Sequence, residues 1–163
     1  MKQSTEIVIT TPSDREVVMT RVFDAPRSLV FEAFTSAELL PRWLEAPGRS
    51  MTVCEIDLRV GGAYRFVWSG PGQKRVGSYG VYRDVVAPER VVRTEAWEDW
   101  DAGEVLVTTE FTEDDDHTIV TVTARFPSRE IRDQVLEAGM KSGAVTNYER
   151  LAVLLSHRRA VPA

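Results

Sequence analysis

Charged side chains fall on one face of a strand predicted over residues 91–97. Successive side chains of a strand point to opposite faces, so Val91, Arg93, Glu95 and Trp97 share a face. If this face is inward, Arg93 and Glu95 reach the interior, where unpaired charges are costly. They would then pair with each other or with a polar group of a ligand. If the face is outward, both charges are simply solvated.

Glu95 is the only carboxylate that we nominate as a general base. Desolvation beside Trp97 would make it a stronger proton acceptor, as acid–base catalysis requires. Tyr82 and Asn147 are candidates for further hydrogen bonds to a ligand.

Three aromatic residues alternate along the next candidate strand, over residues 63–68. Tyr64, Phe66 and Trp68 share one face, which must point towards the interior. One interpretation is that they fill a solid core. The other is that they line a cavity together with Trp43, Trp97, Met140 and Gly143, since small-molecule sites are mostly apolar with few polar groups.

Other catalytic signatures do not occur in the sequence. His117 follows the acidic run 113–116 and His157 falls in the last turn of a predicted helix, so neither has an obvious partner. There is no nucleophile elbow, no His-Glu pair at metal-ligand spacing, no phosphate-binding glycine loop and no dinucleotide fingerprint. Cys54, within a predicted strand, is typical of an inert buried thiol. We therefore expect no metal, no cofactor and no catalytic residue other than the candidate Glu95.

A long amphipathic helix is predicted over residues 128–157, with Ser128 as its N-cap. Its inward stripe contains Leu136, Met140, Gly143, Ala144, Asn147, Leu151 and Leu154. Gly139 and Gly143 each cost about 1 kcal/mol relative to alanine. These small residues indicate either a close approach of helix and sheet or room for a ligand between them.

Most of the preceding chain is predicted to be strand, over residues 6–10, 16–23, 52–57, 63–68, 76–86, 91–97, 104–112 and 118–126. The connections after residue 50 are too short for crossover helices, which favours an antiparallel meander. Two short helices are predicted after the second run, one following Pro26 and one over residues 37–43. One long helix after many strands predicts an α+β fold in which a curved antiparallel sheet wraps around that helix.

Composition limits the classes of partner. The 163 residues predict one domain spanning residues 1–163, with its core at about 17–157. The net charge is −5 and the basic residues are scattered, so we expect no nucleic-acid partner. No apolar run has the length of a membrane span, and one cysteine with no signal segment predicts a cytoplasmic protein. An unpaired edge strand would permit a homodimer.

Specific segments carry a resemblance to a known family. They are Thr20-Arg21-Val22-Phe23-Asp24-Ala25-Pro26, Val30-Phe31-Glu32-Ala33-Phe34-Thr35, Trp43, Cys54-Glu55-Ile56-Asp57-Leu58-Arg59, Gly61-Gly62-Ala63-Tyr64, Pro88-Glu89-Arg90, Gly139-Met140 and Tyr148-Glu149-Arg150-Leu151. Together they resemble the bacterial SRPBCC (START/Bet v 1-like) proteins, in the branch named after the activator of the heat-shock chaperone ATPase. The resemblance implies a helix-grip fold with an apolar cavity. The chain departs from many relatives at residues 43–47, where they have Trp-Trp-Gly-Pro.

Three functions are open from the sequence. The first is a non-enzymatic container for a small apolar or aromatic molecule, held between the sheet and the C-terminal helix. The second is an enzyme of polyketide cyclase or dehydratase type that uses Glu95 with Tyr82 or Arg93. The third is contact with a chaperone or another protein, through an exposed apolar patch around Leu39, Leu40 and Trp43.

Overall fold

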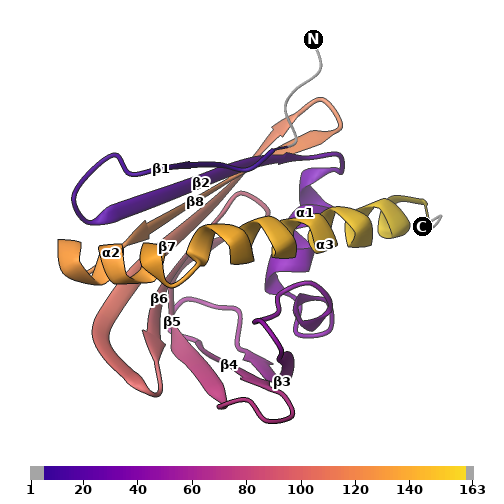
Figure 1. Cartoon of the computed structure of the whole chain (residues 1–163). Helices are drawn as coiled ribbons and strands as arrows, with labels where there is room; N and C mark the ends of the chain where they lie inside the picture. The colour runs from indigo at the N-terminus through magenta and orange to yellow at the C-terminus, as the bar shows by residue number, and fades with distance from the viewer. Residues whose placement is uncertain (1–5, 161–163) are drawn as a thin grey trace.

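The computed structural model describes residues 6–160, which form a curved eight-stranded antiparallel sheet with helices on one side (Figure 1). The strand order is β1-β2-β8-β7-β6-β5-β4-β3. The strands are β1 (Val8–Thr10), β2 (Glu16–Phe23), β3 (Ser50–Ile56), β4 (Ala63–Ser69), β5 (Val76–Val86), β6 (Arg90–Trp97), β7 (Trp100–Asp114) and β8 (His117–Arg125). This arrangement, with a C-terminal helix across the sheet, confirms the predicted α+β helix-grip fold.

The sheet is a meander from β3 to β8, as the short connections predicted, and β2 then pairs with β8. One predicted loop is wrong. Residues 99–103 were expected to connect two strands, but β7 begins at Trp100 and pairs with Trp97, so the turn contains only Glu98 and Asp99. Register shifts interrupt the pairing at Tyr82/Asp84 and Glu95/Trp97. Such bulges bend and twist a sheet, which helps it to curve around the interior.

The insertion between β2 and β3 contains α1 (Arg27–Thr35) and the short 3₁₀ helix η1 (Leu40–Arg42). The helix predicted over residues 37–43 is therefore reduced to one turn, with Pro41 in its first positions, where a missing N–H costs nothing. Trp43 connects the two helices of the insertion, since it follows η1 and its indole Nε1 donates to the Ala33 carbonyl of α1 at 2.9 Å. This insertion forms a compact cap beside the C-terminal helix (Figure 1).

The C-terminal helix is not continuous. It is divided into α2 (Arg129–Glu137) and α3 (Met140–Ala160), with Gly139 between them at φ 96°. A left-handed residue cannot continue an α-helix, and glycine is the residue that adopts it without strain. The single predicted helix over residues 128–157 is thus corrected to two helices.

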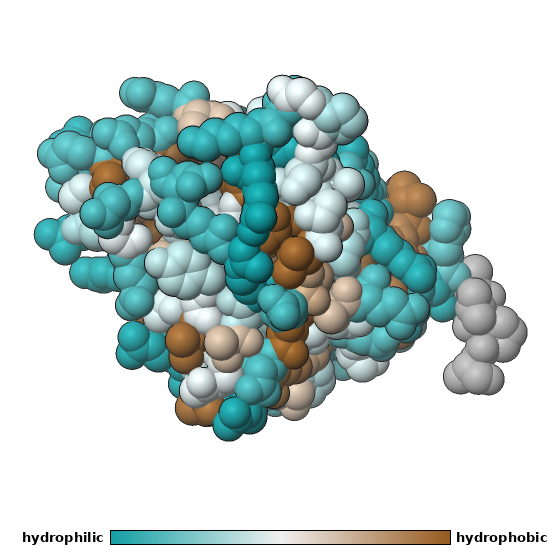
Figure 2. Space-filling model, turned by 90° about the horizontal axis from the view of Figure 1, so that it is seen from below, coloured by the Kyte–Doolittle hydropathy of each residue, from teal (hydrophilic) through white to brown (hydrophobic). Residues whose placement is uncertain are grey.

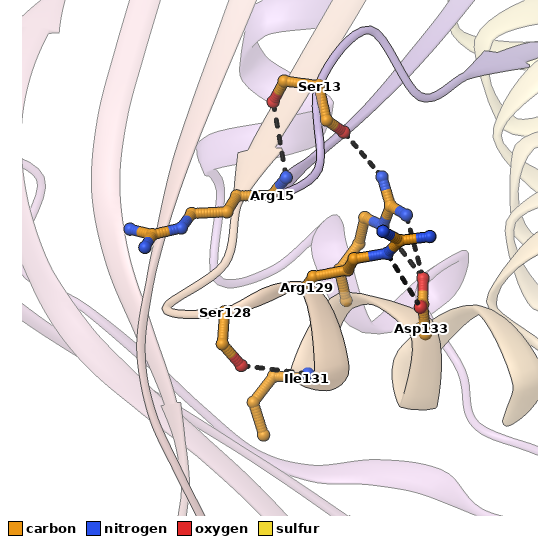
Figure 3. Close-up of polar contacts among 7 residues, drawn as sticks. Ser13, Arg15, Ser128, Arg129, Ile131 and Asp133 are labelled. Atoms are coloured by element: carbon orange, nitrogen blue, oxygen red, sulfur yellow. Dashed lines mark hydrogen bonds and ion pairs between the residues drawn. The ribbon is translucent and has the colours of Figure 1, made fainter.

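Polar contacts position α2 at the end of the β1–β2 hairpin (Figure 3). Ser128 accepts a hydrogen bond from the Ile131 backbone at 3.2 Å, which confirms the predicted N-cap. Arg132 is buried, and its Nη1 donates to the Ser13 carbonyl at 2.6 Å while its Nε and Nη2 donate to Asp133. Arg132 is not part of the inward stripe predicted from spacing. It is buried because it connects α2 to the hairpin.

The two glycines of the C-terminal segment should respond to alanine in opposite directions. A Cβ at Gly143 meets no atom within 4 Å, so Gly143→Ala should raise the free energy of unfolding by about 0.5–1 kcal/mol. At Gly139 the positive φ should make alanine destabilising by about 1–2 kcal/mol. Urea denaturation of both variants measures this, and a gain at Gly139 would contradict the assigned break.

The described residues include no helix with the length and apolar character needed to cross a membrane.

Candidate functional site

A partly enclosed cavity of about 180 Å³ lies between the sheet, the cap and α3. Most of the side chains around it are apolar. The residues that line it are Met19, Phe34, Thr35, Leu40, Trp43, Leu44, Phe66, Tyr82, Val91, Arg93, Thr109, Phe111, Val122, Ala144, Asn147 and Tyr148. The cavity is therefore built by residues from nearly every element of the fold.

The floor of the cavity is a row of side chains across four neighbouring strands. Val91 of β6 pairs with Thr109 of β7, Thr109 with Val122 of β8, and Val122 with Met19 of β2. Side chains directly opposite each other in an antiparallel sheet lie on the same face. Three of the four are apolar, so this end of the cavity suits the apolar part of a ligand.

The roof is aromatic and comes from the cap and α3. The ring of Phe34 lies 4.9 Å from that of Trp43 and 5.3 Å from that of Phe111, and the Tyr148 ring lies 6.1 Å from Trp43. The edge-to-face and tilted arrangements are those that aromatic pairs favour. These contacts fix the width of the cavity on this side.

Asn147 fastens α3 to the cap. Its Nδ2 donates to the Glu45 carbonyl at 3.0 Å, and its Oδ1 accepts from the Glu45 backbone N–H at 3.3 Å. Arg150, one turn further, forms an ion pair with the Glu45 carboxylate at 3.0 Å. Both polar atoms of the Asn147 amide are thus bonded to the Glu45 backbone, so this residue closes the cavity wall.

Arg93 is the charged group of the cavity. Its Nη1 donates to the Tyr64 hydroxyl at 2.7 Å and to Glu95 Oε2 at 2.9 Å, and its Cζ lies 5.1 Å from the centre of the Tyr64 ring. Tyr64 in turn donates to the Thr94 carbonyl at 2.5 Å. Burial lowers the pKa of Arg93, but Tyr64 and Glu95 raise it further than burial lowers it. The guanidinium is thus charged and held in a fixed orientation.

Two tyrosine hydroxyls at the cavity are kept neutral by burial. Burial raises the pKa of Tyr82 to about 12, although the charge of Arg93 acts in the opposite direction. Burial also raises the pKa of Tyr148, again against the charges of Arg21 and Arg93. At neutral pH both phenols are therefore hydrogen-bond donors and acceptors.

Several polar groups of the cavity lack a partner. Within residues 6–160, no protein group bonds to the hydroxyls of Tyr82, Thr109 and Tyr148 or to Nε and Nη2 of Arg93. None of them is sealed off, since the fully buried polar atoms without a partner in this range are Arg27 Nε and Arg158 Nε. The cavity therefore offers accessible donors inside a largely apolar lining.

Five of the eleven residues predicted from the sequence line the cavity, namely Trp43, Phe66, Tyr82, Arg93 and Asn147. The face of β6 that carries Arg93 points inward, which settles the orientation that the sequence left open. Tyr64 and Glu95 lie behind Arg93 and support it.

The other four predicted residues lie elsewhere. Trp68 is buried beyond the cavity, where its Nε1 donates to the Leu44 carbonyl at 3.0 Å and its ring lies 6.2 Å from that of Trp97. Met140 begins α3 and packs against the core away from the cavity. Gly143 borders an outer groove beside residues 45–50.

Sequence reasoning missed the residues that meet the cavity from distant segments, above all Phe34, Thr109, Phe111 and Tyr148. A signal existed for two of them. Thr109 and Phe111 are in phase with buried Val105 and Val107 along β7 and alternate with the less buried Thr108 and Glu110. The inward phase of β7 could have been read from this alternation.

The remaining candidates for chemistry are apart from the cavity. His117 lies 3.5 Å from Asp24 at the surface, and His157 is exposed in the last turn of α3. Burial raises the pKa of the Cys54 thiol to about 11, which fits the inert thiol expected from the sequence. Within the described part of the chain, no cluster of three or more His, Cys, Asp or Glu residues could hold a metal ion.

Several solved structures are similar to this chain over nearly its whole length. A protein from Rhodobacter sphaeroides is 31% identical, with a TM-score of 0.88 over 93% of this chain and 99% of that one. A protein from Staphylococcus epidermidis is 25% identical, with a TM-score of 0.81 over 95% and 97% of the two chains. A Mycobacterium smegmatis protein at 23% identity, with a TM-score of 0.83 over 97% and 100%, supports the fold alone.

A comparison with curated proteins gave no match. The family model described as "Activator of Hsp90 ATPase homolog 1-like protein" matches residues 24–156, which include the cap, the six strands β3 to β8 and most of the C-terminal segment. Its range contains most residues that line the cavity. The chain therefore belongs to the family of Activator of Hsp90 ATPase homolog 1-like proteins.

Proposed function

We propose that this protein is a container that binds one small, mostly apolar or aromatic molecule in the cavity between the sheet, the cap and α3. The observation that carries the proposal is a partly enclosed, largely apolar cavity in which several accessible polar groups have no partner within residues 6–160. Small-molecule sites have this composition, with few polar groups in an apolar lining. The fold of this family is commonly used to bind hydrophobic ligands, which is consistent with the proposal.

The size of the cavity limits the ligand. Drug-sized ligands occupy sites of about 300–1,000 Å³, whereas this cavity has a volume of about 180 Å³. An apolar engineered cavity of roughly 150 Å³ binds benzene. The proposed ligand is therefore compact, with about one ring or an equivalent aliphatic group.

An enzymatic role for Glu95 has less support. Glu95 is not among the residues that line the cavity, and its Oε2 accepts a hydrogen bond from Arg93. A general base must reach the proton that it removes. Glu95 is thus better placed to orient Arg93 than to act on a bound molecule.

A protein-interaction role also has little support at the expected place. Leu39, Leu40 and Trp43 are 2%, 3% and 2% exposed, so they do not form an exposed apolar patch. On the face seen in Figure 2, hydrophobic residues occur in small groups and along one narrow strip between hydrophilic residues. Large apolar patches mark interaction sites on many proteins, and this face does not present one.

The container proposal is tested by filling the cavity. Ala144 of α3 lines the cavity, and Ala144→Leu would place three further carbon atoms in it. We expect toluene to raise the melting temperature of the wild type and to have little effect on Ala144→Leu, because the volume needed by the ring is occupied. Native mass spectrometry of freshly purified wild-type protein should also detect a bound small molecule.

Val145→Leu is the matched control, since Val145 is adjacent on α3 and 38% exposed. This variant should respond to toluene as the wild type does. Equal stabilisation of Ala144→Leu and Val145→Leu by toluene would mean that the ring binds outside this cavity. Absence of any response in the wild type would count against the container.

A further inference from the structure

The unpaired groups of Arg93 form one edge of the guanidinium. Both hydrogen bonds to Tyr64 and Glu95 use Nη1, whereas Nε and Nη2 have no partner within residues 6–160. These two nitrogens lie side by side on the planar guanidinium and donate in parallel. That edge matches the two oxygens of a carboxylate, with which arginine forms two parallel hydrogen bonds.

The orientation of this edge is fixed before any ligand binds. Tyr64 and Glu95 hold Nη1, and the Tyr64 ring lies beneath the guanidinium at 5.1 Å. A side chain held in this way loses little conformational entropy when it binds a ligand. Arg93 is therefore a prepared donor group and not a flexible surface charge.

Polar and apolar groups are separated along the cavity. Tyr82 is the direct cross-strand partner of Arg93, so its phenol lies at the same end. Val91 lies two residues before Arg93 on β6. It begins the row that continues through Thr109 to the apolar Val122 and Met19. A ligand with one polar end and an apolar body fits this arrangement, with the polar end at Arg93.

The charges near the cavity favour an anion at this end. The charge of Arg93 opposes the rise in pKa of both Tyr82 and Tyr148, and the charge of Arg21 opposes that of Tyr148. Glu95, which is bonded to Arg93, instead raises the pKa of Tyr64, which lies behind the guanidinium. Arg93 is paired with Glu95, and Arg21 with Glu149 at 3.7 Å, so the attraction for an anion comes from the unpaired Nε and Nη2 of Arg93 and not from an excess of positive charge.

We propose that the bound molecule is a compact carboxylic acid, whose carboxylate accepts from Nε and Nη2 of Arg93 and whose apolar body lies along the Val91 row. The hydroxyls of Tyr82 and Tyr148 are the further donors at the cavity. The inference rests on the proposed container function and specifies its ligand class. It also gives Glu95 and Tyr64 a role, as the residues that orient Arg93.

Three probes of similar size separate this inference from the container function itself. They are benzoate, benzamide and toluene, with binding to the full chain measured by isothermal titration calorimetry at neutral pH. We expect benzoate to bind at least about tenfold more tightly than benzamide and toluene, because charge-assisted hydrogen bonds are the stronger ones. If toluene or benzamide binds as tightly as benzoate, the carboxylate assignment is overturned and the container function remains. If none of the three binds, the container function itself fails.

Substitutions then assign the effect to Arg93. Arg93→Met keeps an unbranched apolar stem without the guanidinium and should lower benzoate affinity at least about tenfold without weakening toluene binding. Arg93→Lys retains the charge without the paired donors and should give an intermediate loss, which keeps the test valid if the methionine variant folds poorly. Arg83→Met, on the same sheet but at an exposed position, is the control and should bind benzoate as the wild type does. Unchanged benzoate affinity in both Arg93 variants would overturn the assignment.

Discussion

Replacing Trp43 with alanine should lower the free energy of unfolding by about 3–5 kcal/mol, because this replacement removes the largest side chain at the centre of the cap. Trp43 is 2% exposed and packs against Phe34, with the ring centres 4.9 Å apart, and against Tyr148 of α3 at 6.1 Å. The variant also leaves the Ala33 carbonyl without its indole donor. Since whole domains are stable by only about 5–15 kcal/mol, the loss should be visible as a large shift of the urea midpoint.

Trp100 provides the matched control for this substitution. It is the same residue type but 38% exposed, at the start of β7. Trp100→Ala should change the free energy of unfolding by about 1 kcal/mol or less, because less apolar surface returns to water. Equal losses for the two variants would mean that Trp43 does not hold the cap against α3.

The strands could be predicted well because their signal is local. β5 has the bounds expected from the sequence, and β4 extends only one residue further than predicted, to Ser69. An alternation of apolar and polar residues with a period of two indicates a strand and also shows which of its residues face inward. For that reason the inward positions of Tyr64, Phe66 and Trp68 followed from the sequence alone.

The break in the C-terminal helix could not be predicted from local spacing. A glycine inside a helix costs about 1 kcal/mol, so the apolar stripe on either side of Gly139 favoured one continuous helix. The helix is divided because its two parts are bound to different parts of the fold. α2 is held at the β1–β2 hairpin by Arg132, whereas α3 is held at the cap by Asn147. Contacts over more than 100 residues of sequence therefore decide the conformation of Gly139.

The site was predicted in part for the same physical reason. Alternation placed Arg93 and Trp97 on one face of β6, but it gives no information on depth along the strand. Arg93 lies at the cavity, whereas Trp97 is four residues further along, at the end of β6, and packs beside Trp68. The aromatic roof of the cavity depends on which helical residues contact the sheet. The position of the cap determines these contacts. Phe34 and Tyr148 come together only in the folded chain.

Alkaline unfolding should provide a second large effect, through Tyr82. The folded protein holds this phenol neutral by burial and raises its pKa to about 12, whereas the unfolded chain ionises near pH 10. A group that ionises more readily in the unfolded chain stabilises the fold fully below about pH 10, and this contribution is lost as the pH rises towards 12. At about 1.4 kcal/mol for each pH unit, the loss from Tyr82 amounts to about 3 kcal/mol.

The comparison with Tyr82→Phe isolates this contribution. The Tyr82 hydroxyl has no protein partner within residues 6–160, so the variant should match the wild type within about 1 kcal/mol at pH 7. Between pH 10 and 12 the wild type should lose about 3 kcal/mol more than the variant does. Tyr64 and Tyr148, whose pKa values burial also raises, contribute to both proteins and cancel in the difference. Parallel stability curves for wild type and variant, from urea denaturation at each pH, would mean that Tyr82 is not desolvated at the cavity.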